Sequence, residues 1–200
     1  MSPRLAAGLV LLAGLATSAG ATAGFADRGL RAAEQALAAL RERHLEAHPR
    51  LQEQEARVAA WRRVVAEIPG APDVYQESRV ELEVLRARHL ENSPRLRELE
   101  ARTAAMAAVL ARQADAPPEL LLAHADLAAG RLRWAERHPR LIDLEAKVTA
   151  YDRHLLGPSV EPLPLRLLRA EHDHLVARLG DNHPRIVGLR EEIAAAAGGR

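Results

Sequence analysis

One tripeptide decides the fold of this chain, and it occurs four times: His48-Pro49-Arg50, Ser93-Pro94-Arg95, His138-Pro139-Arg140 and His183-Pro184-Arg185. The step is 45 residues each time, without insertion or deletion. A constant period of this size is typical of a repeat protein with one supersecondary unit per period. Proline suits the first position of a helix and moves the preceding residue out of helical geometry. We therefore expect each tripeptide to begin a helix, with the His or Ser as N-cap and Ser as the better cap.

Large apolar residues recur on both sides of each tripeptide at spacings that alternate between three and four. After the second tripeptide the stripe consists of Leu96, Leu99, Thr103, Met106 and Leu110, and before it of Tyr75, Ser78, Leu82, Leu85 and His89. This pattern is the a/d stripe of a coiled coil. Because only three or four residues separate the two stripes, the pattern predicts an antiparallel αα-hairpin in every period.

The predicted fold class is all-α, with four tandem antiparallel helical hairpins arranged like a coiled coil or as a short α-solenoid. The repeats cover about 27–71, 72–116, 117–161 and 162–200. Their predicted helices are 27–45, 49–67, 73–90, 94–113, 118–135, 139–156, 163–179 and 184–197. Longer junctions rich in Pro and Gly join the hairpins. The expected core contacts are Leu37 with Val58, Leu82 with Thr103, Leu127 with Val148 and Leu85 with Leu99, beside a core column of Trp61, Met106 and Tyr151.

The first 23 residues have the order of a secretory signal peptide. Arg4 gives a positive start, residues 5–16 are uncharged and apolar, and Ala21-Thr22-Ala23 fits the A-x-A cleavage pattern. We predict cleavage after Ala23, a repeat domain over 24–200, and export to the periplasm or cell envelope. The alternative is an uncleaved N-terminal anchor helix, although this stretch falls short of the ~20 strongly apolar residues of a spanning helix.

Composition argues against most chemical functions. The net charge is +1, which gives no general attraction to nucleic acid, and the chain has no cysteine. No catalytic or phosphate-binding motif is present, and the nine histidines lack the spacing of a metal site. We therefore predict a protein that is not an enzyme and has no catalytic residues, no metal site and no cofactor. A histidine-based metal protein or hydrolase is the alternative.

Arginines recur at both ends of the short turn, and they form the only candidate binding edge. The arginine of each tripeptide follows the proline, and another arginine stands five residues before the His or Ser. The interpretation we favour is ion pairing within the repeats, with the carboxylates at Glu53, Glu98 and Asp143, three residues after a tripeptide arginine. The alternative is an edge that binds an acidic polysaccharide or anionic lipid, with Arg185 the least compensated. Its candidate residues are Arg133, Arg140, Arg178 and Arg185.

Residues 175–193, which read LVARLGDNHPRIVGLREEI, carry a resemblance to a known family. The segment resembles the periplasmic helical region of the bacterial polysaccharide chain-length determinant and co-polymerase family, where a helix ends in a short turn and His-Pro opens the next. The resemblance covers the hairpins alone, and the family's membrane helices and α/β portion have no counterpart here. It implies an envelope setting and a coiled-coil role rather than the co-polymerase activity.

These observations predict a structural or scaffolding protein of the bacterial envelope, associated with polysaccharide assembly or export. Its partner would be another protein, or a second copy, bound through helical faces. The alternative is a soluble interaction adaptor of the tetratricopeptide or HEAT kind, whose helices pack on more than one side. Small residues such as Ala59, Ala60, Ala104 and Ala105 would allow such close stacking.

Overall fold

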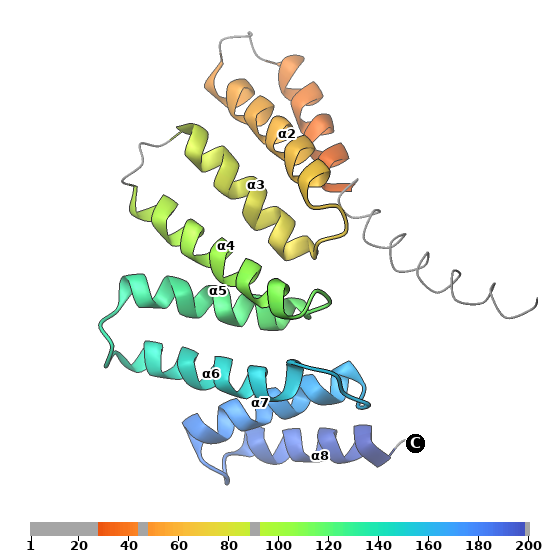
Figure 1. Cartoon of the computed structure of the whole chain (residues 1–200), viewed down its shortest axis with the longest axis vertical. Helices are drawn as coiled ribbons and strands as arrows, with labels where there is room; N and C mark the ends of the chain where they lie inside the picture. Colours follow the sequence, from red (N-terminus) through yellow and green to blue (C-terminus); the bar gives the residue numbers. More distant parts are fainter. Residues whose placement is uncertain (1–27, 44–47, 89–92, 199–200) are drawn as a thin grey trace, which may run out of the picture. The chain divides into compact units, whose positions relative to one another are not determined.

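The computed structural model describes residues 28–43, 48–88 and 93–198, and within these ranges the chain is entirely helix and connecting turn (Figure 1). The predicted all-α class is confirmed. The predicted signal peptide, residues 1–23, lies outside the described residues.

Eight helices are described, and the predicted boundaries that fall on described residues are met to within about one helical turn; those at residues 27, 45 and 90 lie outside the described residues. The first covers residues 28–41 of the described chain. The others are α2 (Pro49–Glu67), α3 (Asp73–Arg88), α4 (Pro94–Arg112), α5 (Pro118–Arg133), α6 (Pro139–Leu155), α7 (Leu163–Leu179) and α8 (Pro184–Gly198). The four tripeptide prolines open α2, α4, α6 and α8, so no helix runs through a tripeptide.

The chain forms two compact units, Met1–Glu91 and Asn92–Arg200, whose boundary falls in the second short turn. Unit 1 holds the helix over 28–41, α2 and α3, and unit 2 holds α4 to α8. The expected contacts of Leu82 with Thr103 and of Leu85 with Leu99 join residues of different units and stay predictions.

Histidine caps the helices that follow three of the tripeptides. Nδ1 of His48, His138 and His183 accepts a hydrogen bond from the backbone N–H two residues on, at 3.2, 3.2 and 3.3 Å. Ser93 has nearly the same backbone angles as His48, yet its side chain makes no cap bond. The expectation that Ser is the better cap is therefore wrong for this chain, because its hydroxyl is not used.

The predicted apolar stripes form the cores of both units. In unit 1, Leu37 and Val58 lie in one cluster, together with Trp61 from the predicted core column. In unit 2, Leu127 and Val148 share a cluster, with the half-buried Tyr151 packed against it. These memberships agree with the predicted antiparallel pairing of the first and third hairpins.

Each internal helix buries a second face that the a/d stripe does not include. In α5 this face consists of Leu121, Ala125 and Ala129, all almost fully buried. The reason is serial packing: α5 contacts both α4 and α6, and α7 contacts both α6 and α8. Within unit 2, packing joins only helices consecutive in the chain, and it is more extensive across the long junctions than across the short turns. This arrangement is that of a short solenoid rather than of a bundle closed on itself.

We expect the histidine cap of α8 to contribute measurably to stability. Replacement His183→Ala removes the acceptor for the N–H of Arg185 and should lower the free energy of unfolding by about 1 kcal/mol. His183→Asp keeps an acceptor and should retain the parent stability. Chemical denaturation followed by circular dichroism measures both, and equal stability of the Ala and Asp variants would contradict the role of the cap.

Candidate partner-binding edge

The short turns of unit 2 lie at one end of its helices. In Figure 1 the α5–α6 and α7–α8 turns are on the left, and the α4–α5 and α6–α7 junctions are on the right. All four arginines of the predicted edge are at the turn end, at the last turns of α5 and α7 and the first turns of α6 and α8. The partner of each arginine decides whether the positive charge of that arginine is available to a ligand.

A repeating ion pair, here called the carboxylate ladder, ties each tripeptide helix to the next helix along the chain. Its steps are Glu53–Arg88, Glu98–Arg133 and Asp143–Arg178. Each acid stands five residues after the tripeptide's first residue, and each arginine five before the next one. Because both columns follow the 45-residue period, the separation of 35 residues is the same at every step.

The Arg133 step of the ladder is a two-point contact. Its Nε donates to Glu98 Oε2 at 2.8 Å, and an Nη donates to Oε1. In the Arg178 step, Nη1 lies 3.6 Å from Asp143 Oδ2. Both candidate arginines thus have a carboxylate partner inside the protein, which reduces the charge they offer to an external anion.

Arg185 is also paired, contrary to the expectation that it is the least compensated. Its Nη2 donates to Glu171 Oε1 of α7 at 2.6 Å. Two further pairs within hairpins have the same separation of 14 residues: Arg41–Glu55 and Arg131–Glu145. Considering only carboxylates near the tripeptide missed Glu171, which lies more than three helical turns back along the chain.

Arg140 differs from the other three candidates. Its guanidinium carbon lies 5.8 Å from the centre of the Trp134 ring, within the range of a cation–π contact. The same ring stacks on His138, with centroids 5.2 Å apart and planes 9° from parallel. No carboxylate among the described residues pairs with Arg140, and its expected partner Asp143 binds Arg178 instead. The sequence predicted one common role for these four arginines because they recur with the same period. In the structure, Arg140 differs from the other three because it contacts an aromatic ring and not a carboxylate.

Other ion pairs between packed helices differ in their residues from one repeat to another. Glu34–Arg62 in the first repeat and His124–Asp152 in the third occupy equivalent positions with the acid and base exchanged. Arg63–Glu83 and Arg153–Asp173 are likewise equivalent, at 3.1 and 3.0 Å. At the step between these two pairs, the equivalent positions are both alanine: Ala108 in the second repeat and Ala128 in the third. Both partners of this pair are therefore replaced together at that step.

Histidine–aspartate contacts are concentrated on α5, α6 and α7. Their distances are 2.7 Å for His124–Asp152, 2.9 Å for His154–Asp173, 3.3 Å for His172–Asp173 and 3.1 Å for His174–Asp143. Among the residues the structure describes, no group of three or more histidines and acids is arranged to hold a metal ion. These side chains act as polar contacts between packed helices.

Asp173 is the centre of this network. Burial would raise the pKa of its carboxyl group, but hydrogen bonds from His154, His172 and Arg153 outweigh burial and hold that pKa below its ordinary value. The ionised form is therefore favoured by the folded protein.

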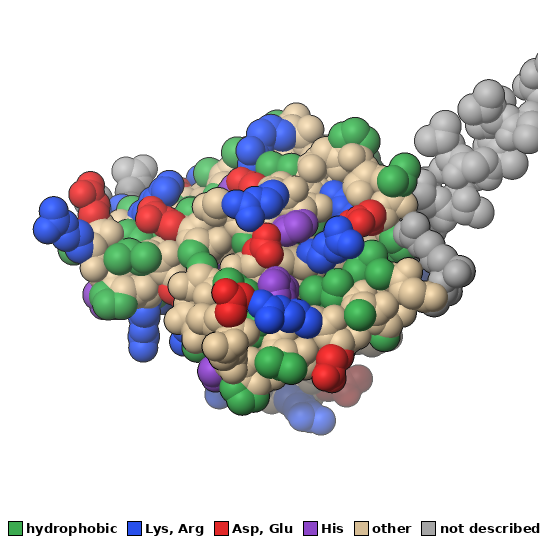
Figure 2. All heavy atoms as spheres, turned by 90° about the horizontal axis from the view of Figure 1, so that it is seen from below, with side chains coloured by type: hydrophobic (Ala, Val, Ile, Leu, Met, Phe, Trp, Pro, Cys, Tyr) green, Lys and Arg blue, Asp and Glu red, His purple; other side chains and the backbone are tan. Residues whose placement is uncertain are grey.

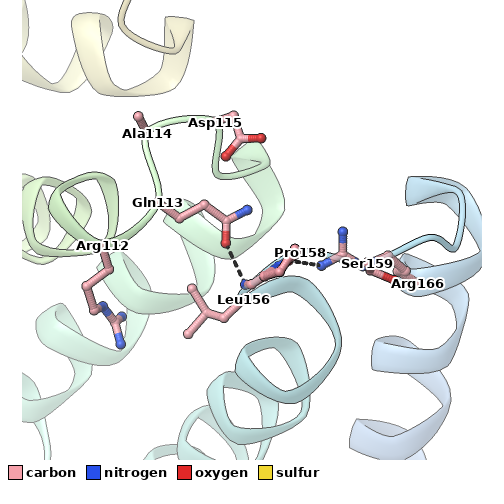
Figure 3. Close-up of a pocket in the computed structure, with 9 residues that line it drawn as sticks. Arg112, Gln113, Ala114, Asp115, Leu156, Pro158, Ser159 and Arg166 are labelled. Carbon is pink, nitrogen blue, oxygen red and sulfur yellow. Dashed lines mark hydrogen bonds between the residues drawn. The ribbon is translucent and has the colours of Figure 1, made fainter.

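A hollow of about 700 Å³ lies at the opposite end of the unit 2 helices, between the α4–α5 and α6–α7 junctions. Its polar side chains already hold the two junctions: Gln113 Oε1 accepts from the N–H of Gly157 at 3.0 Å, and Arg166 Nη2 donates to the Gly157 carbonyl at 3.3 Å (Figure 3). Arg166 Nε also donates to the His154 carbonyl at 2.7 Å. They do not converge on a space for a ligand. We therefore retain the short-turn end as the candidate site.

Charge is mixed on the face of the molecule seen from the α8 end. Figure 2 shows basic, acidic and histidine side chains interleaved there, with hydrophobic side chains between them. That face has no broad area of one sign, so it offers no extended surface for a polyanion.

Comparisons with protein-family models, curated proteins and solved structures found no match to this chain. No helix in the described part of the chain has the length and apolar character needed to cross a membrane. The function must therefore be argued from the residues themselves.

We expect the Glu98–Arg133 step to stabilise unit 2 modestly. A double-mutant cycle with Glu98→Ala and Arg133→Ala should give a coupling energy of about 0.5 kcal/mol at low salt, since the pair is partly exposed. The coupling should decline at high salt. A coupling of zero at low salt would mean that the ladder does not contribute to stability.

The Asp173 network gives a pH-dependent prediction. Asp173→Asn should lower the free energy of unfolding at neutral pH by about 1 kcal/mol, because three donors lose an ionised acceptor. A lowered pKa in the folded state stabilises the protein above the ordinary value of 3.8, and this stabilisation is lost as the pH falls through the folded-state pKa. The difference between parent and variant should therefore vanish in acid. Asp115→Asn, at an exposed junction residue, is the control, and a pH-independent difference for Asp173→Asn would contradict the prediction.

Proposed function

We propose that this chain is a non-enzymatic helical-repeat scaffold that binds a protein partner in the bacterial cell envelope. The observation that carries the proposal is the carboxylate ladder, which commits three acid–arginine pairs, including Arg133 and Arg178 of the predicted edge, to holding successive helices together. Side chains committed to such pairs are poorly placed for acid–base chemistry. The serially packed helices of unit 2, in contrast, offer a repeated surface to a partner.

The envelope setting is supported by the first 23 residues and by the resemblance of residues 175–193 to the helical region of chain-length determinant proteins. The association with polysaccharide assembly or export rests on that resemblance alone. A protein partner is the better supported ligand, because the mixed charge seen in Figure 2 and the pairing of Arg133, Arg178 and Arg185 leave few free cations for a polyanion.

Localisation is tested by mass spectrometry of the chain isolated from fractions of its native cells. We expect a mature N-terminus at Gly24 and recovery with the periplasm or envelope. An intact Met1 or Ser2 on a cytosolic protein would contradict the envelope part of the proposal and favour a cytoplasmic adaptor.

Partner binding is tested in the same cells with a photo-reactive phenylalanine analogue, placed separately at exposed Ala135 in a short turn and exposed Ala114 in a long junction. A scaffold should give a discrete adduct with another protein from at least one position. Irradiation that yields only the free chain from both positions would argue against a scaffold. The two positions sample both ends of the unit 2 helices, so an adduct from Ala114 alone would support a scaffold whose partner binds away from the short turns.

A further inference from the structure

The third short turn, which comprises residues 132–142, contains arginine side chains whose positive charge is not neutralised by any carboxylate among the described residues. Arg140 contacts an aromatic ring rather than an acid, and Arg137 is exposed in the turn. Within the described ranges, neither arginine has a carboxylate partner. Glu136 is the one acid in the turn and is exposed too, while Glu98 is occupied by Arg133. The turn therefore retains a net positive charge.

Exposed aliphatic side chains flank the same turn. Leu132 near the end of α5 is 57% exposed, and Ile142 near the start of α6 is 54% exposed. Because α5 and α6 are antiparallel and packed together, both residues lie at the turn end of the hairpin. Single exposed aliphatic residues need no explanation, and these two matter because both flank the same positively charged turn.

This combination is specific to the third repeat among the described turns. The residues equivalent to Leu132 are Glu42 and Ala87 in the first two repeats, and those equivalent to Ile142 are Gln52 and Arg97. The fourth repeat has Val187 at the second position, but its tripeptide arginine is paired with Glu171. The 45-residue period explains what the turns share and does not explain this difference.

Trp134 gives the turn a rigid shape. Its ring stacks on His138 and lies under Arg140, and it packs so closely on α5 that a Cβ added to Gly130 would come within 3.2 Å of it. Arg140 is held by this contact in a defined position. Tryptophan and arginine are among the residues enriched in protein–protein interfaces and their energetic hot spots.

We propose that the third short turn is the binding site for an acidic peptide segment that also carries aliphatic or aromatic side chains. This proposal rests on the proposed scaffold function. Carboxylates of the segment pair with Arg137 and Arg140, and its apolar side chains cover Leu132 and Ile142. Both features of the partner follow from charge and surface complementarity with the turn.

A polysaccharide or a lipid surface fits the turn less well. Stacking on a sugar needs an open aromatic face, and the Trp134 ring is already in contact with His138, Arg140 and the helix at Gly130. Recognition of anionic lipid typically uses clusters of about four to eight basic residues, whereas this turn has two arginines without a carboxylate partner among the described residues. A polysaccharide also offers no aliphatic side chains to cover exposed Leu132 and Ile142, as a peptide segment would.

The experiment selects dodecapeptides from a random display library on the whole chain and measures each by fluorescence anisotropy. We expect enrichment of sequences that combine Asp or Glu with Leu, Ile or Phe. Their affinity should fall by roughly tenfold or more for Arg137→Glu/Arg140→Glu and for Leu132→Ser/Ile142→Ser. The matched control is Arg57→Glu/Arg112→Glu, which makes the same charge change at two exposed arginines outside the turn and should bind like the parent.

Circular dichroism verifies that every variant is folded, and polygalacturonate and vesicles containing anionic lipid are titrated alongside. Selected peptides that bind the Arg137→Glu/Arg140→Glu variant as well as the parent would overturn this site while leaving a scaffold function in place. Failure to enrich any acidic–apolar sequence would overturn the site too, whereas the photo-crosslinking result bears on the scaffold itself. Tight binding of either polyanion, lost in that variant, would replace the peptide with a polyanion.

Discussion

The proline that opens α2, α4, α6 and α8 is the constraint on which the structure depends. Proline cannot donate a backbone hydrogen bond and displaces the residue before it from helical geometry, so the chain must turn at each tripeptide. The resulting helices have 15 to 19 residues in α2 to α8, and most of the stability of helices in proteins comes from tertiary packing. They are stable because each internal helix of unit 2 packs on the helix before it and the helix after it.

Serial packing explains both the second buried face and the abundance of alanine. A helix between two neighbours buries more than one stripe, and small residues such as Ala125 and Ala129 let backbones approach closely. Charged residues are then left at the margins of each contact, where they pair with charges of the adjacent helix. Most of the arginines in this protein thus have a structural explanation before any functional one is needed.

Most of the fold could be predicted from the sequence, because proline and the alternating three–four spacing act locally. The second buried face could not be predicted in this way, since Ala125 and Ala129 give no contrast between an inner and an outer side. The partners in the ion pairs were predicted wrongly for a different reason. The columns of Glu98 and Arg133 were both visible, but a one-dimensional search joins an acid to the nearest arginine and not to one 35 residues away. The separate position of Arg140 depends on a ring contact that no spacing rule indicates.

The paired charges also bear on the order of the repeats. The ladder is the same at every step from Glu53 to Arg178, so it would accept any repeat after any other. The Arg63–Glu83 and Arg153–Asp173 pairs are different, because the step between them has alanine at both positions, Ala108 in the second repeat and Ala128 in the third. If the helix bearing Ala128 followed α6, Arg153 would face a methyl group and lose its acid. The ladder therefore stabilises the contact between any two consecutive repeats in the same way. The variable pairs, in contrast, favour the native order of the hairpins over other orders.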